Sequence, residues 1–163
     1  KGDDVLNKML EVAGLDEHVV RSNNNNSGGA QYLIKNIDTT ISGSKTYDYL
    51  SSLNIGNPYQ DYNNYVVTRD KNKYNDETVT GFINLDQLKE LPISNKTWVV
   101  GGSQVIDYLL KHNKISEIII FQIPILLGDG VKLFSNSEYI NKLELLNVDS
   151  DKDFIQFHYK VKN

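Results

Sequence analysis

A strand that runs into two glycines and then a helix is the feature that most constrains how this chain can fold. Residues 96–110 read KTWVVGGSQVIDYLL. The apolar β-formers at 98–100 are typical of a strand buried on both faces, and the apolar residues from Val105 onward recur at helical spacing. Gly101 and Gly102 then place bare backbone and a helix N-terminus at the carboxyl end of a strand, where α/β sheets bind ligands and phosphates. A tight turn alone would explain the two glycines equally well.

The composition limits the class of protein. A chain of 163 residues predicts one domain, residues 1–163, with a core of its own. The net charge of −4 argues against nucleic-acid binding, which depends on a basic face. There is no cysteine, so disulfides and thiol chemistry are excluded, and the three histidines lack metal-ligand spacing, so we expect no metal. No apolar run reaches the length of a membrane span and no secretory signal is visible, so we expect a cytoplasmic protein without membrane contacts.

Strands alternate with helices along most of the chain. The polar, asparagine-rich segment 22–29 predicts a mobile loop. The remaining pattern predicts helices over 3–13, 31–36, 45–50, 85–91 and 103–110, and strands over 38–42, 65–68, 78–83, 98–100, 115–123, 143–148 and 154–161. This order predicts an α/β fold with a mostly parallel central sheet and an antiparallel edge formed by the last strands.

Four motifs, in this order and at this spacing, resemble the dihydrofolate reductase-like family. They are IDTTISGSKTY at 37–47, VVTR at 66–69, VVGGS at 99–103 and PILLGDGVKLF at 124–134. The resemblance covers residues 31–161 and is greatest to single-domain proteins related to the C-terminal reductase domain of the bacterial riboflavin biosynthesis protein RibD. It implies a three-layer fold that binds NADPH across the strand ends and transfers a hydride to a small heterocycle, pyrimidine-like or pteridine-like. The resemblance is also compatible with a homodimer.

The resemblance assigns three groups of residues to NADPH. The cofactor phosphates would meet a helix N-terminus formed by Gly43, Ser44, Lys45 and Thr46. The adenosine 2′-phosphate would be held by Thr68 and Arg69. The pyrophosphate and the nicotinamide ribose would approach the glycine turn, which consists of Gly101, Gly102, Ser103 and Gln104. An arginine fork suits a phosphate, and an acidic chain must concentrate positive charge locally. Arg69 as a solvated turn residue and Lys45 as a surface charge remain open alternatives. The resemblance also implies a cis peptide within the diglycine.

The sequence departs from the family in places that affect the predicted activity. The family begins with a central strand and a Ser-Leu-Asp-Gly-like turn, and nothing in 1–29 has that pattern, so we expect this first strand to be missing from the given chain. Ser44 stands where relatives often carry arginine. Asp3 or Asp4 is the nearest candidate proton donor by position, although either could instead cap a helix, so the catalytic residues are unknown. The alternative hypothesis is a non-catalytic cofactor-binding or structural homologue of the same fold.

Overall fold

The computed structural model describes residues 37–54, 56–93, 96–126, 128–130, 132–134, 142–150 and 154–162. The helices predicted over 3–13 and 31–36 and the loop predicted over 22–29 lie outside these residues. The described elements are β1 (Thr39–Gly43), α4 (Ser44–Ser52), β2 (Asn63–Val67), the 3-10 turn η1 (Lys71–Lys73), β3 (Gly81–Ile83), α5 (Leu85–Glu90), β4 (Thr97–Gly101), α6 (Ser103–Lys111), β5 (Glu117–Gln122), β6 (Lys142–Ser150) and β7 (Ile155–Lys162).

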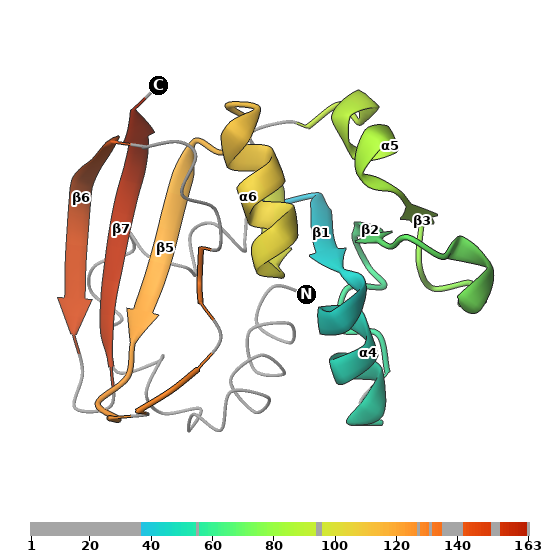
Figure 1. Ribbon diagram of the computed structural model, residues 1–163, viewed down its shortest axis with the longest axis horizontal. Coiled ribbons are helices and arrows are strands. Elements are labelled where there is room, and N and C mark those ends of the chain that lie inside the picture. The colour runs from blue at the N-terminus through green and yellow to red at the C-terminus, as the bar shows by residue number, and fades with distance from the viewer. Residues whose placement is uncertain are drawn as a thin grey trace.

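The first four strands form a parallel sheet in the order β3-β2-β1-β4. Parallel strands need crossover connections: α4 lies between β1 and β2 and α5 between β3 and β4, whereas α6 leads from β4 to β5, which lies outside this sheet (Figure 1). The register pairs Gly43 with Val67 and Ser42 with Gly101. The carboxyl ends of β1, β2 and β4 therefore meet at one edge of the sheet.

Helices cover both faces of this sheet, which confirms the predicted three-layer α/β fold. One face carries a core that includes Ile41 from β1, Leu88 from α5 and Leu109 from α6. On the other face, Leu50 of α4 and Tyr59 pack with partly buried side chains that include Trp98. Neighbouring residues of a strand point to opposite faces, so β1 and β4 contribute to both cores.

The last three strands form a separate antiparallel sheet in the order β5-β7-β6 (Figure 1). The alternation over 154–161 predicted a strand with two different faces, and β7 confirms it. In β7, Gln156 is buried and its neighbour Ile155 is exposed on the other face. A register shift in the pairing with β7 marks a bulge between Leu145 and Asn147 of β6.

Two expectations about strands were wrong. The strand predicted over 78–83 is shorter, because Asp76 accepts hydrogen bonds from the backbone N–H and the hydroxyl of Thr78 and holds a turn there. The residues at 98–100 are half-buried rather than buried on both faces. Within the described part of the chain, β4 pairs only with β1 and β5 only with β7, so each of these two strands has one edge without a described neighbour.

The helix predicted after Asn84 has the expected start. The Asn84 side chain accepts from the backbone N–H of Gln87 at 2.9 Å, and the Gln87 side chain accepts from the Asn84 N–H at 3.2 Å, which is a capping box. The helix ends at Glu90, two residues before Pro92. Among the described helices, none has the length and apolar character needed to cross a membrane.

Candidate functional site

The structure brings the predicted glycines of two different motifs together. A Cβ built on Gly43 would lie 3.7 Å from the carbonyl oxygen of Gly101 and 3.9 Å from the Cα of Gly102. A Cβ built on Gly102 would lie 3.9 Å from the Thr46 hydroxyl. The N-termini of α4 and α6 therefore converge at the carboxyl edge of the sheet, although Gly43 and Gly101 are 58 positions apart in the sequence.

Both converging helices begin without a side-chain cap. Gly43 is the N-cap residue of α4 and Gly102 that of α6, and neither helix has an acidic residue in its first turn. The first N–H groups of a helix have no partner within the helix, and the helix dipole makes this end positive. Two such ends side by side form an edge that favours an anionic group such as a phosphate.

The turn between β4 and α6 depends on glycine at two successive positions. Gly101 has φ +137° and Gly102 has φ +36°, a region that side chains with a Cβ rarely adopt. No cis peptide bond occurs among the described residues, so the expected cis diglycine peptide is wrong, and positive φ angles make the turn instead. Among the described residues, nothing lies within 4 Å of a Cβ built on Gly101, although Gly101 itself is buried and Gly102 is half-buried.

The third predicted motif follows β2 at the same edge. The Thr68 N–H donates to the carbonyl of Ile83 at 2.8 Å, and the Thr68 hydroxyl exchanges hydrogen bonds with the backbone of Asp70 at 3.2 Å. These contacts bury Thr68 and fix the direction of the chain, and the next residue, Arg69, is exposed. Lys45, in the first turn of α4, is also exposed, so both cations face solvent and are available to a ligand.

The remaining predicted residues lie in the first turns of the two helices. Ser44 and Ser103 are half-buried, and Gln104 is exposed. The candidate proton donors Asp3 and Asp4 lie outside the described residues. Among those described, no group of three or more histidine and acidic side chains could hold a metal ion.

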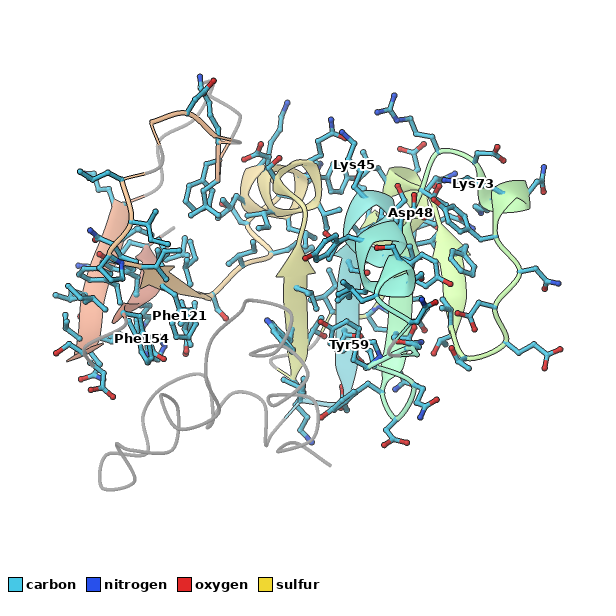
Figure 2. The ribbon with its side chains drawn as sticks, turned by 90° about the horizontal axis from the view of Figure 1, so that it is seen from below. Lys45, Asp48, Tyr59, Lys73, Phe121 and Phe154 are labelled. Atoms are coloured by element: carbon cyan, nitrogen blue, oxygen red, sulfur yellow. The ribbon has the colours of Figure 1, made fainter. Side chains whose placement is uncertain are left out.

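A cluster that the sequence did not reveal connects α4 to the loop between β2 and β3. Lys73 forms an ion pair with Asp48 at 3.0 Å (Figure 2), and the hydrogen bonds to Asp48 and Tyr74 raise the pKa of the Lys73 ammonium group. The Tyr74 ring stacks on Phe82 with centroids 4.8 Å apart, and Tyr47 meets both rings edge-on. These contacts hold the segment after Arg69 against α4. Only the abundance of tyrosine hinted at such a cluster.

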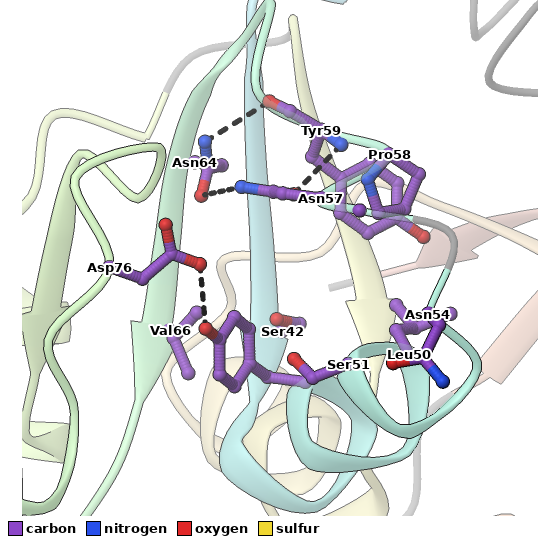
Figure 3. Close-up of a pocket in the computed structure, with 12 residues that line it drawn as sticks. Ser42, Leu50, Ser51, Asn54, Asn57, Pro58, Tyr59, Asn64, Val66 and Asp76 are labelled. Carbon is purple, nitrogen blue, oxygen red and sulfur yellow. Dashed lines mark hydrogen bonds between the residues drawn. The ribbon is translucent and has the colours of Figure 1, made fainter.

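A cavity of about 440 Å³ lies on the side of α4 that faces β2 (Figure 3). Its walls include Ser42, Leu50 and Tyr59, and its rim includes Asp76, which accepts a hydrogen bond from the Tyr47 hydroxyl at 2.7 Å. Hydrogen bonds from Thr78 and Tyr47 lower the pKa of Asp76, and burial raises the pKa of Tyr59 to about 12.

The cavity and the predicted cofactor residues are different places. The lining includes a carboxylate but no lysine or arginine, and it contains none of the predicted NADPH residues. A phosphate therefore has no counter-charge in this cavity. The anion-favouring edge formed by the two helix N-termini is the better site for a phosphorylated ligand.

The parallel sheet with helices on both faces and the second, antiparallel sheet make up an α/β fold of the dihydrofolate reductase-like class. The family model for the RibD C-terminal domain matches residues 60–157. An uncharacterized protein of Bacillus subtilis (strain 168), YwjB, is 36% identical over 129 residues, which are 76% of this chain and 73% of that protein. The chain belongs to the RibD C-terminal domain family.

Solved structures share the fold at lower identity. A putative riboflavin biosynthesis protein from Shewanella sp. PV-4 matches with a TM-score of 0.69 and 23% identity, over 90% of this chain and 86% of the other. Dihydrofolate reductase from Enterococcus faecalis, in complex with NADP(H), matches with a TM-score of 0.58 and 16% identity, over 81% of this chain and 79% of the other. At these identities the likeness concerns the fold.

Proposed function

We propose that this protein is an NADPH-dependent reductase that transfers a hydride to a small heterocyclic substrate, pyrimidine-like or pteridine-like. The observation that carries the proposal is the convergence of two uncapped helix N-termini, at Gly43 and Gly102, beside the exposed Arg69 at the end of β2. Membership of a reductase-domain family and the likeness to a reductase solved with NADP(H) support it. The localisation we propose is the cytoplasm.

Each part of the edge has a task in this proposal. The N–H groups at the starts of α4 and α6 donate to phosphate oxygens. Lys45 and Arg69 supply the positive charge, and Arg69 forms a fork on the 2′-phosphate that distinguishes NADPH from NADH. The backbone at Gly101 and Gly102 allows the pyrophosphate to approach closely because no Cβ blocks it.

The remaining chemistry depends on positioning. Bound NADPH supplies the hydride, and the protein fixes the reacting groups near one another and excludes water. The helices that carry the site are anchored by buried side chains, Leu50 in α4 and Val105 and Leu109 in α6. A rigid scaffold of this kind holds the nicotinamide in one orientation without further loss of entropy.

The first test is binding of NADPH and NADH, followed through the fluorescence of Trp98. Trp98 is the only tryptophan, and it lies three residues before the glycine turn. Its ring meets the Tyr59 ring edge-on, with the ring centroids 5.9 Å apart. We expect saturable quenching by NADPH and a much weaker response to NADH. Equal binding of the two, or binding of neither, would contradict the proposed 2′-phosphate site.

The second test separates a reductase from a cofactor-binding homologue. NADPH oxidation is measured with a panel of pteridines, pyrimidines and quinones. Oxidation that depends on one of these compounds supports the reductase. Tight NADPH binding without oxidation across the whole panel would instead favour the non-catalytic homologue.

A further inference from the structure

The face of the parallel sheet that α4 covers is polar beneath the helix. Neighbouring residues of a strand point to opposite faces, and Ile41 packs in the core on the other face, so Thr40 and Ser42 of β1 face α4. Their partners in the parallel register are Asn64 and Val66 of β2. Strands of a parallel sheet that are buried under helices normally carry Val, Ile or Leu, whereas three of these four buried residues are polar. The small Ser42 side chain leaves space between the sheet and the helix that a larger apolar residue would fill.

This space is the cavity of about 440 Å³ between α4 and β2 (Figure 3). Pockets that hold small organic ligands have volumes from about 300 Å³ upward, whereas one water molecule occupies only about 30 Å³. The cavity therefore has the size of a ligand site. Its apolar walls include Leu50, Pro58 and Val66, and the Tyr59 ring adds an aromatic surface on which a flat ring can pack.

Ser42 brings a hydroxyl without a partner to this cavity. The residue lines the cavity and is only 5% exposed, and no hydrogen bond of its hydroxyl occurs among the described residues (Figure 3). Buried hydroxyl groups in folded proteins nearly always have a hydrogen-bond partner, because an unmade bond costs free energy. A ligand in the cavity that exchanges a hydrogen bond with Ser42 would supply that partner.

The amide side chains around the cavity are already engaged and form a fixed wall. Asn64 donates to the carbonyl oxygens of Tyr59 and Thr78 at 3.1 and 2.9 Å. Asn57 donates to the Thr78 carbonyl at 3.1 Å and accepts from the backbone N–H of Tyr59 at 2.9 Å. These bonds hold the segment before β2 against the sheet. The cavity is therefore preformed, and a ligand does not lose affinity by having to order its walls.

The charge at the rim selects against anions. Asp76 is the one charged side chain among the described residues that line the cavity. Its carboxylate accepts from the backbone N–H and the hydroxyl of Thr78 at 2.9 and 2.7 Å and from the Tyr47 hydroxyl at 2.7 Å. These bonds keep the carboxylate ionised by lowering the pKa of Asp76, and they occupy both of its oxygens, so little capacity is left for a cation. An uncharged ligand suits this lining best.

We propose that the cavity is a binding site for an uncharged, flat heterocycle of nucleobase size, separate from the cofactor edge. The Ser42 hydroxyl can donate and accept, and a nucleobase edge offers both N–H groups and carbonyl oxygens to it. The faces of the ring pack on Tyr59 and the apolar walls. The nicotinamide is assigned to the turn at Gly101 and Gly102, and neither glycine lines the cavity, so its ligand is distinct from the ring that would accept the hydride.

The first test is binding of uracil to the full chain by saturation-transfer NMR. Two analogues share its ring: orotate adds a carboxylate, and 5-(aminomethyl)uracil adds an ammonium group. We expect uracil to bind about 5-fold or more tightly than orotate and at least as tightly as the cationic analogue. No binding of uracil, equal binding of orotate, or tighter binding of the cationic analogue would each overturn the proposal.

Amide chemical shifts locate the bound ring. Uracil should shift the backbone signals of Ser42, Asn57 and Val66, and leave those of Arg69 and Gly102 unchanged. NADPH, if the proposed cofactor edge is right, shifts the second group. The two proposals therefore fail separately. Uracil-induced shifts confined to Arg69 and Gly102 would mean that the ring binds at the cofactor edge and would overturn the cavity site.

Ser42→Ala tests the hydroxyl itself. We expect uracil to bind about 2-fold to 10-fold more weakly, which corresponds to the loss of one hydrogen bond. The midpoint of urea unfolding should not fall, because the substitution removes a buried hydroxyl that has no partner in the described part of the protein. Reduced stability with an unchanged affinity for uracil would show a structural role for Ser42 and refute its assignment to the ligand.

A matched pair of helix substitutions blocks the cavity without touching its floor. Ser51 and Ser52 are both exposed in the last turn of α4, but only Ser51 lines the cavity. Ser51→Phe places a ring at the cavity wall and should abolish uracil binding, whereas Ser52→Phe should leave it unchanged, and NADPH affinity should be unaltered in both variants. Full uracil affinity in Ser51→Phe, or an equal loss in Ser52→Phe, would overturn the proposal.

Discussion

Replacing Arg69 by alanine is the most direct test of the proposed cofactor edge. Arg69 is exposed and follows β2 directly after the buried Thr68. No hydrogen bond or ion pair of Arg69 occurs among the described residues, so its removal should change the free energy of unfolding by less than about 0.5 kcal/mol. Any change in cofactor affinity would then reflect the lost contact with the ligand.

The size of the effect follows from the exposure of the side chain. A hydrogen bond to a charged group contributes about 1.5–3 kcal/mol, and screening by solvent lowers this toward about 1–2 kcal/mol for an exposed pair. We therefore expect Arg69→Ala to weaken NADPH binding by about 5-fold to 30-fold. NADH has no 2′-phosphate, so its affinity should stay within about two-fold.

The assay is titration of each variant with NADPH and with NADH, followed by Trp98 fluorescence. Arg69→Lys keeps the charge but loses the two-pronged geometry, and should fall between the wild type and Arg69→Ala. Lys89→Ala is the control, because it removes one positive charge from the last turn of α5, away from the strand ends. An unchanged NADPH affinity in Arg69→Ala, or an equal loss for both nucleotides, would refute the assignment of the 2′-phosphate to Arg69.

Four further substitutions test the local structure by chemical or thermal unfolding, and a fifth, Gly81→Ala, is a control for NADPH binding. Gly102→Ala forces a Cβ into positive φ and should cost about 1–2 kcal/mol and weaken NADPH binding, whereas Gly81→Ala, with ordinary contacts at 3.4 Å or more, should leave NADPH binding unchanged. Asn64→Ala removes a buried side chain that donates to the Tyr59, Tyr62 and Thr78 carbonyls and should cost about 2–4 kcal/mol; a loss below about 1 kcal/mol would contradict this. Asn84→Ala removes the capping box and should lower the free energy of unfolding by about 1 kcal/mol. An unchanged midpoint of urea unfolding would contradict this prediction. The pKa of Asp76 is lowered on folding, so the stability that its carboxylate contributes is present above the unfolded pKa of about 3.9 and is lost as pH falls through the lower folded pKa. Asp76→Asn should therefore make the melting temperature less sensitive to pH in that acid range. An identical pH dependence of the melting temperature in the wild type and the variant would contradict this prediction.

The sequence could predict the two strand–glycine–helix turns because their signals are local. A short apolar strand followed by glycine and a helix specifies both the end of the strand and an uncapped helix start. The structure places Gly43 and Gly102 where this pattern predicted them. The same reasoning predicted the start of α5 at Asn84, where all the partners lie within three residues.

Features that depend on contacts between distant residues could not be predicted. Nothing in the order of residues indicates that the Asn64 side chain bonds to Thr78, 14 positions away, or that Asp48 pairs with Lys73, 25 positions away. The division into two sheets was missed for the same reason, since the apolar run in β5 is compatible with a place in either sheet. Alternation within a strand predicts two faces but does not predict what covers them.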